Sequence, residues 1–289
     1  ECLFARAAGS NLRILADNIW DYSHDDIPEA WRLIGEDPRD DVRAPQFAQL
    51  VRAFMPDVLD LQEYSLHMHQ QFYPLIRRYG YRIAYEGEEP WNNTPIFYNP
   101  ETVELVDVNY VLYAPSCWSN IGSKSYTSAV FRKKDTGRLF AVVNTHLWWK
   151  SEAAQPGSTY ARAAQVRLMM AEAEVLKNKY GCTIFVTGDM NAYEDSLPIR
   201  QFIEGGYTPC YKAATDATDN GNGHHICGPK DGYSRTSRRR SPDREKGAID
   251  HCFIYNAQEG VAVKVFDCIT ARITVKLTDH YPYLIDAAL

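Results

Sequence analysis

The sequence predicts a single domain of the α/β class. Apolar runs of strand length alternate with stretches of helical period along all 289 residues, and no internal repeat or long low-complexity linker interrupts them. With 45% hydrophobic and 24% charged residues, the chain is long enough to bury a large core. We therefore expect one domain over residues 1–289, with its core from about residue 11 to residue 289.

The first part of the chain contains two predicted strands and a helix. The stretch LRILADNIW begins with period-two alternation and predicts a strand that ends at Asn18. The stretch PQFAQLVRAFMP places apolar side chains on one face of a helix that stops before Pro56. The next run, DVLDLQEYS, predicts a short buried strand that ends on Glu63.

The middle of the chain contains two strand pairs and the longest predicted helix. The stretch TPIFYNPETVELVDV predicts two strands around a turn at residues 99–100. The stretch SYTSAVFRKKDTGRLFAVVNTHLWW predicts a hairpin that turns at residues 135–137 and ends its second strand at His146. The stretch TYARAAQVRLMMAEAEVLKNKYG is rich in helix formers, and Gly181 is its expected C-cap.

The last part begins with TIFVTGDMNAYEDS, which places Asp189 and Asn191 in a strand-to-helix loop. The stretch SLPIRQFIEGG then predicts a helix capped by Ser196. Residues 216–247 are polar and rich in Gly, which predicts a long surface loop of the kind that shapes a substrate site. Two more strands, AIDHCFIYN and GVAVKVFD, and the terminal stretch LTDHYPYLIDAAL complete the chain.

Polar side chains that can do chemistry fall at or just past the ends of these apolar strands. They are Asn18, Glu63, His146, Asp189, Asn191, Asp250, Asp279 and His280. Strand ends that face one way form a common rim, where α/β proteins carry their active sites. Several carboxylates on one rim would repel each other unless a cation neutralised them. Oxygen ligands without a cysteine cluster favour Mg²⁺ or Mn²⁺.

Seven motifs resemble those of the endonuclease/exonuclease/phosphatase superfamily of metal-dependent phosphoesterases. They occur in the order typical of the family, from about residue 12 to residue 285: DNIW, DVLDLQE, PIFYNPETVELVD, VVNTHL, VTGDMNA, IDHCFI and TDHYPYLID. The resemblance implies a DNase I-like fold, a four-layer α/β sandwich of two packed mixed β-sheets flanked by helices. It also implies a hydrolase, a phosphatase or nuclease, that breaks a phosphate ester by in-line attack of an activated water.

The resemblance also implies a role for each rim residue. Glu63 would be the main metal ligand, with Asn18 beside it and Asp279 sharing the ion. His146 and His280 would stabilise the charge that develops on the phosphate, and Asp250 would orient His280. Asn191 would hold the water or a phosphoryl oxygen. The resemblance leaves open whether Asp189 or His280 is the base that deprotonates the water.

The substrate is less constrained than the reaction. Trp148, Trp149 and Lys150 follow His146 directly, and two adjacent Trp side chains on a strand cannot both point inward. These three residues and Tyr126 are therefore candidate substrate contacts. We favour a small soluble phosphoester, such as a sugar phosphate or a nucleotide-like diester. A nuclease acting on DNA or RNA and a non-catalytic phosphate-binding module are the alternatives.

Charge and composition weigh on partners and compartment. The net charge of −6 disfavours nucleic acid as a partner without excluding it, and no stretch is apolar enough for membrane insertion. Seven scattered cysteines without a C-x-x-C pair disfavour a disulfide scaffold or a zinc ribbon. The N-terminus lacks a signal-peptide pattern but begins with Glu, so the cytoplasm is favoured and a processed secreted form stays open.

Two features of the polar stretch at residues 216–247 each have a functional interpretation and one without a function. The HHIC stretch, at residues 224–227, could bind zinc together with Cys210 upstream, although the spacing matches no common zinc site. The basic residues between Arg238 and Lys246 could clamp a second phosphate of the substrate, or could simply be a solvated loop.

Overall fold

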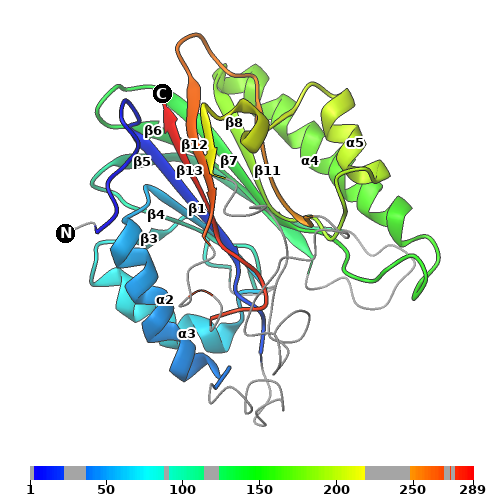
Figure 1. Cartoon of the computed structure of the whole chain (residues 1–289), viewed down its shortest axis with the longest axis horizontal. Helices are drawn as coiled ribbons and strands as arrows, with labels where there is room; N and C mark the ends of the chain where they lie inside the picture. Colours follow the sequence, from blue (N-terminus) through cyan, green and yellow to red (C-terminus); the bar gives the residue numbers. More distant parts are fainter. Residues whose placement is uncertain are drawn as a thin grey trace.

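The computed structural model describes residues 3–22, 37–87, 91–113, 124–218, 248–269, 274 and 277–289. Two mixed β-sheets pack face to face, and helices cover the outer face of each sheet (Figure 1). The four layers are the α/β sandwich that the motifs predict.

In the described part of the chain, the first sheet has seven strands, with the first and last strands in sequence at its centre. In sheet order they are β10 (Asp216–Thr218), β12 (Ala262–Cys268), β13 (Tyr283–Ala288), β1 (Leu12–Asn18), β2 (Val58–Gln62), β4 (Ile96–Tyr98) and β3 (Arg82–Ile83). Strand β1 runs parallel to β2 and antiparallel to β13. The predicted strands that end near Asn18 and Glu63 are therefore adjacent.

The second sheet, counted over the described residues, has six strands and carries the predicted hairpin. In sheet order they are β5 (Val103–Leu112), β6 (Ser125–Lys133), β7 (Leu139–His146), β8 (Thr183–Asp189), β11 (Asp250–Tyr255) and β9 (Thr208–Pro209). Strands β6 and β7 pair antiparallel up to Arg132 and Leu139, which confirms the hairpin and its turn. The two strands around residues 99–100 are β4 and β5. They belong to different sheets, so that turn carries the chain across the sandwich rather than closing a hairpin.

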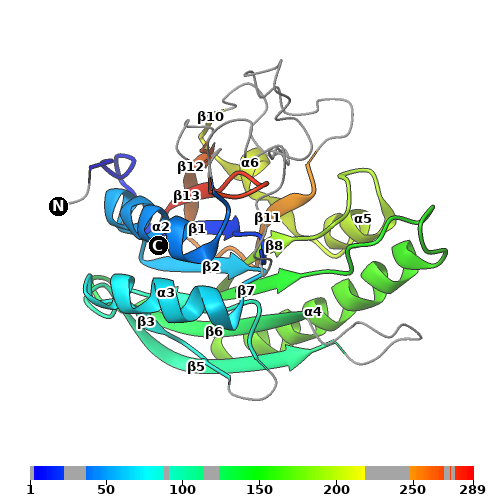
Figure 2. The ribbon, with the colours of Figure 1, turned by 90° about the horizontal axis from the view of Figure 1, so that it is seen from below.

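The helices separate by sheet, as two views of the ribbon show (Figures 1 and 2). Helices α2 (Asp40–Phe54) and α3 (Leu66–Arg77) pack on the first sheet, and α4 (Ser158–Tyr180) and α5 (Leu197–Glu204) pack on the second. A short helix, α6 (Cys210–Ala213), follows β9. A third apolar cluster, between the sheets, takes the side chains of alternate strand residues such as Leu12 and Ile14.

Local sequence explains where these helices end. Gly181 closes α4 in the left-handed conformation, as predicted. Ser65 caps α3 by accepting a hydrogen bond from the backbone N–H of Met68. Ser196 occupies the predicted N-cap position of α5, but its hydroxyl donates instead to the carbonyl oxygen of Tyr193.

Strand register brings the polar rim together. Strands β7 and β8 are parallel, and their last residues, His146 and Asp189, are partners in the ladder. Strand β11 runs antiparallel to β8 and begins at Asp250, which is also opposite Asp189. In the other sheet, Asn18 is the partner of Gln62, the residue before Glu63. The strand ends at Asn18, His146 and Asp189 therefore meet at one edge of the sandwich. Asp250 instead begins its strand, and Asp279 and His280 precede β13, so these three reach the same edge from strand starts rather than strand ends.

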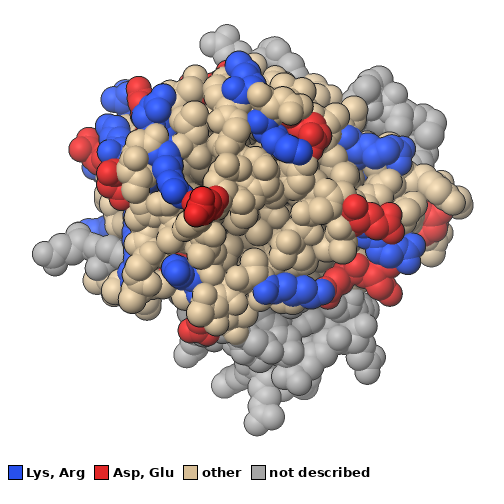
Figure 3. Space-filling model, turned by 90° about the horizontal axis from the view of Figure 1, so that it is seen from above, with Lys and Arg blue, Asp and Glu red and all other residues tan. Residues whose placement is uncertain are grey.

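Most of the polar stretch at residues 216–247 lies outside the described residues, which include only β10 from it. The HHIC stretch and the basic residues 238–246 are among those outside. On the face that Figure 3 shows, basic and acidic side chains are interspersed, and no continuous basic stripe crosses it.

Candidate active site

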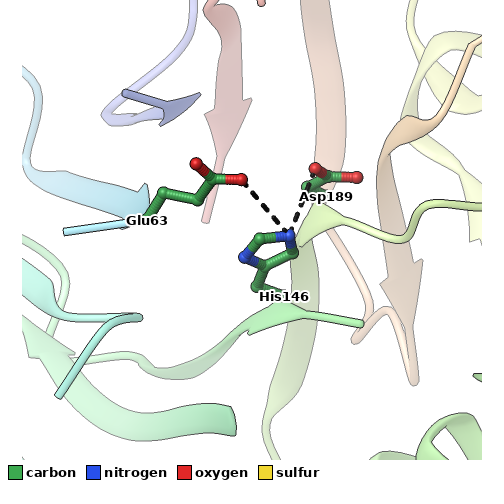
Figure 4. Close-up of side chains that lie close together, drawn as sticks. All are labelled: Glu63, His146 and Asp189. Carbon is green, nitrogen blue, oxygen red and sulfur yellow. Dashed lines mark ion pairs between the residues drawn. The ribbon is translucent and has the colours of Figure 1, made fainter. Parts of the chain in front are cut away.

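Three side chains at or just past the ends of three strands meet at the centre of the rim (Figure 4). The Nε2 atom of His146 lies 3.8 Å from Oε1 of Glu63 and 3.4 Å from Oδ2 of Asp189. His146 and Asp189 are buried, and Glu63 is half-buried. The first sheet supplies Glu63 and the second supplies the other two residues, so the site spans both sheets.

A second group of side chains shares Asp189 with the first. The Nε2 atom of His280 lies 3.8 Å from Oδ2 of Asp189, and its Nδ1 atom lies 2.8 Å from Oδ2 of Asp250. Oδ1 of Asp279 is 3.8 Å from the same Nε2 atom. Asp250, the first residue of β11, thus forms a hydrogen bond with the imidazole of His280 at the rim.

The amide of Asn18 links the two sheets. Its Nδ2 atom donates to Oδ2 of Asp189 at 2.9 Å and to Oε1 of Glu63 at 3.3 Å, while its Oδ1 atom accepts from the backbone N–H of Trp20. In this arrangement Asn18 orients the two carboxylates, and a metal contact through its oxygen would need the amide to rotate. Glu63 is held further by the backbone N–H of Asp21, at 2.9 Å.

Asn191 lies beside His146, with its Nδ2 atom 3.1 Å from Nε2 of the imidazole and 3.2 Å from the carbonyl oxygen of Leu147. Its backbone N–H donates to Oδ1 of Asp189 at 2.8 Å. Both Asn191 and Glu63 have positive φ angles, of 47° and 54°. Non-glycine residues hold this conformation at some cost, and such strain is concentrated at functional sites.

Steric crowding explains why the GDMN stretch begins with glycine. Gly188 has a φ of 143°, and a Cβ atom there would lie 2.0 Å from the carbonyl oxygen of Thr145. Strands β7 and β8 can approach closely enough to align His146 with Asp189 only because that Cβ is absent.

Lys124 is a site residue that the sequence analysis missed. It directly precedes β6, whose first residue is the ladder partner of His146. Its Nζ atom lies 3.0 Å from Nδ1 and 2.9 Å from Nε2 of His146, and the side chain is buried. The sequence GSKSYT carries no spacing signal for such a residue. The β6–β7 register had to be known before Lys124 could be placed.

The pKa values of His146, Glu63 and Lys124 are shifted by burial and by their charged neighbours. Burial and the neighbouring ammonium of Lys124 lower the pKa of His146 well below its ordinary value, so this imidazole is neutral at neutral pH. Burial opposes ionisation of Glu63, but His146 and Lys124 lower the pKa of that carboxyl. Because His146 is neutral, Lys124 is the persistent positive charge beside Glu63. Burial in turn lowers the pKa of Lys124.

The pKa values of Asp189 and His280 are raised, whereas those of His146, Glu63 and Lys124 are lowered. Burial and the charge of Asp250 raise the pKa of Asp189 to about 7. Burial disfavours the charged form of His280, but the charges of Asp250, Asp279 and Asp189 outweigh it and raise the pKa of His280 well above its ordinary value. Asp189 can therefore take up a proton near neutral pH, whereas His280 already carries one.

The donor set fits a hard divalent cation. Carboxylate oxygens of Glu63 and Asp189 approach one imidazole nitrogen closely enough for a single ion to reach all three, and Asp189, Asp250 and His280 form a second such group among the described residues. Carboxylate oxygens suit Mg²⁺ and Mn²⁺. Asp279, the other predicted ligand, lies on the His280 side of the cluster.

The structure does not bring all the candidate substrate contacts to the site. Trp148 donates its indole N–H to Ser158 of α4, and Tyr126 packs in the same apolar cluster between the second sheet and α4. Strand alternation explains Tyr126, because its neighbour Ser125 hydrogen-bonds toward the first sheet and so turns Tyr126 outward. Trp149 is exposed, and the ammonium of Lys150 lies 5.6 Å from the centre of its ring.

The chain belongs to the endonuclease/exonuclease/phosphatase family. The family model, described as Endonuclease/Exonuclease/phosphatase family, matches residues 31–280. This assignment confirms the resemblance carried by the seven motifs and makes a phosphoesterase hydrolase the class of this protein. None of the curated proteins is significantly similar to this chain in sequence.

Solved structures confirm the DNase I-like fold. A mannosyl-6-phosphatase of Bacteroides thetaiotaomicron superposes with a TM-score of 0.72 and 19% identity, covering 96% of this chain and 100% of that one. The human nocturnin catalytic domain with bound sulfate gives 0.67 and 18%, covering 98% and 96%. TDP2 of D. rerio, complexed with a single-strand DNA product, gives 0.64 and 16%, covering 96% and 98%.

Proposed function

We propose that this protein is a Mg²⁺- or Mn²⁺-dependent phosphatase that hydrolyses a small soluble phosphate monoester, such as a sugar phosphate. The observation that carries this proposal is the rim on which Glu63, His146, Asp189 and His280 meet, with Lys124 beside them. Glu63 would hold the ion, joined by Asn18 after rotation of its amide and by Asp279 from the His280 side of the rim. The bound ion would neutralise charge on the phosphoryl oxygens and the leaving group.

The chain's own residues then divide the remaining work. Asp189, with a pKa of about 7, accepts a proton from the attacking water, and Asn191 positions that water or a phosphoryl oxygen. Protonated His280 and the N–H of neutral His146 bind the phosphoryl oxygens as negative charge develops. Asp250 keeps His280 oriented and charged through its bond to Nδ1.

Lys124 favours a monoester over a diester. A monoester phosphate carries up to two negative charges and a diester only one, so a buried ammonium next to His146 interacts more strongly with the monoester. The similarity to a mannosyl-6-phosphatase supports a sugar phosphate. No described helix is long and apolar enough to cross a membrane.

The test compares an aryl phosphate monoester with the matching bis-aryl diester in Mg²⁺, Mn²⁺ and EDTA. We expect monoester hydrolysis that EDTA abolishes and that Glu63→Gln and His280→Asn reduce by about 10³-fold or more. Hexose 6-phosphates, mannose 6-phosphate among them, would then be ranked. Metal-dependent hydrolysis confined to the diester would overturn the monoester proposal. Inactivity of the metal-loaded wild type on every ester would overturn the proposal that the protein is an enzyme.

The alternative is a nuclease, which the similarity to TDP2 with bound DNA favours. The net charge of −6 counts against it. A nuclease would cleave single-stranded oligonucleotides with a rate that falls steeply with salt, because phosphate contacts release counterions.

A further inference from the structure

Two buried cysteines lie in contact at the edge of the second sheet. Cys210 begins α6, Cys252 lies on β11, and their Sγ atoms are 3.0 Å apart. Their side chains are 0% and 4% exposed and belong to the apolar cluster between the sheets. Neither residue is part of the rim.

The backbone places the pair independently of the side chains. In the antiparallel β9–β11 ladder, Ile254 is opposite Thr208 and Phe253 is opposite Pro209. Continuing that register by one residue sets Cys252 opposite Cys210. Opposed residues in an antiparallel ladder have Cα atoms about 4.5–5.5 Å apart. Disulfides bridge Cα separations of about 4.4–6.8 Å, so no backbone movement is required.

We propose that Cys210 and Cys252 form an intramolecular disulfide by exchange with a low-molecular-weight disulfide of the glutathione type. The thiolate of one cysteine attacks that reagent, forms a mixed disulfide and releases one small thiol. The second cysteine then attacks the mixed disulfide and releases the other small thiol. The two cysteine protons end on the two released thiols, so two cysteines are oxidised and one small disulfide is reduced.

Burial sets when the exchange takes place. Burial and the hydrogen bond to Cys210 raise the pKa of the Cys252 thiol well above its ordinary value. The folded pair is therefore a poor nucleophile. The reagent reaches the sulfur atoms before β9 and α6 close over β11, and the finished bond is then shielded from reductants. It closes a loop of about 40 residues and ties the α6 corner to the strand that carries Asp250.

Peptide mapping tests the bond directly. Protein refolded with reduced and oxidised glutathione is unfolded without reductant, alkylated and digested with trypsin. The chain offers peptides 201–212 and 247–264, each with one cysteine. We expect these two peptides to be joined, and to separate when dithiothreitol is added. Cys182, which is buried and free, is the internal control and is alkylated without reductant. Full alkylation of Cys210 and Cys252 in the unreduced sample would overturn the proposal.

A stability measurement gives a second readout. Wild type refolded with reductant should melt roughly 5–10 °C below the oxidised protein, because a loop of this length is no longer closed. The double variant Cys210→Ser/Cys252→Ser should melt at one temperature with or without reductant. Cys182→Ser should keep the wild-type difference. Equal melting temperatures of oxidised and reduced wild type would contradict the cross-link.

Discussion

The Nδ1 atom of His280 and the Oδ2 atom of Asp250 lie 2.8 Å apart, and both side chains are buried. This contact fixes which nitrogen of His280 faces Asp189. It also supplies the largest of the favourable charges that keep His280 protonated. The protonation of His280 therefore depends most on one residue of β11, and the charges of Asp279 and Asp189 add to its effect.

Asp250→Asn should move the pH profile of the enzyme. Without the carboxylate, the pKa of His280 falls, so the charged form that binds the phosphate is lost at lower pH. We expect kcat/KM to drop by about 10²-fold and its alkaline limb to shift to lower pH, measured with saturating Mg²⁺. Asp250→Glu should restore part of the profile. An alkaline limb that stays in place in Asp250→Asn would show that His280 does not set it.

Metal binding should depend on Glu63. Saturating Mn²⁺ should raise the melting temperature of the wild type by several degrees, since an ion at about 100 times its Kd adds about 3 kcal/mol to the free energy of unfolding. Glu63→Gln should fold, but its melting temperature should not respond to Mn²⁺. Asp195→Asn, at an exposed position, should respond as the wild type does. An equal Mn²⁺ response in Glu63→Gln would remove Glu63 from the metal site.

Lys124 should set the preference between ester classes. Lys124→Met removes the buried ammonium beside His146, so kcat/KM for a monoester should fall by about 10–100-fold and that for the matching diester by much less. The ratio of the two constants is the measurement. Lys179→Met, at an exposed site on α4, should leave the ratio unchanged. Equal losses on both substrates would show that Lys124 does not discriminate between them.

Asp60 should make the free energy of unfolding decrease as the pH rises. Burial raises the pKa of its carboxyl to about 7, although the hydroxyl of Thr187 donates to it at 2.7 Å. The folded state therefore binds this proton more tightly than the unfolded chain, whose carboxyl has a pKa near 4. This stabilisation is fully present below pH 4 and is lost as the pH rises through about 7, by roughly 3–4 kcal/mol.

Asp60→Asn keeps the shape of that side chain without the charge. Chemical denaturation between pH 5 and pH 9 should show a smaller decrease in the free energy of unfolding for this variant than for the wild type. Asp195→Asn is the exposed control and should follow the wild type. Parallel pH curves for wild type and Asp60→Asn would mean that Asp60 is ionised at no cost in the folded protein.

Much of the rim could be predicted from the sequence because its residues follow directly after apolar runs. Asn18, Glu63, His146 and Asp189 each follow such a run, and parallel strands collect those ends at one edge. Lys124 could not be predicted, since it precedes its strand and reaches His146 only through the β6–β7 pairing.

The substrate contacts show the other limit of the sequence. Trp148 is buried and Trp149 is exposed, but both lie beyond the end of β7, so strand alternation does not govern them and could not say that Trp148 would turn toward α4. The direction of the Tyr126 side chain could not be predicted either, because it depends on which face of β6 meets the other sheet. Such directions follow from tertiary packing, which strand periodicity does not encode.

The pairing of His146 with Asp189 in one ladder has a further consequence. Backbone hydrogen bonds between the parallel strands set the spacing of these two groups, so the sheet itself fixes the distance between the reacting side chains. No loop closure is needed to assemble them. Connecting segments can therefore change in length and composition without altering that spacing, and a lineage built on this scaffold can acquire new substrates while keeping one reaction.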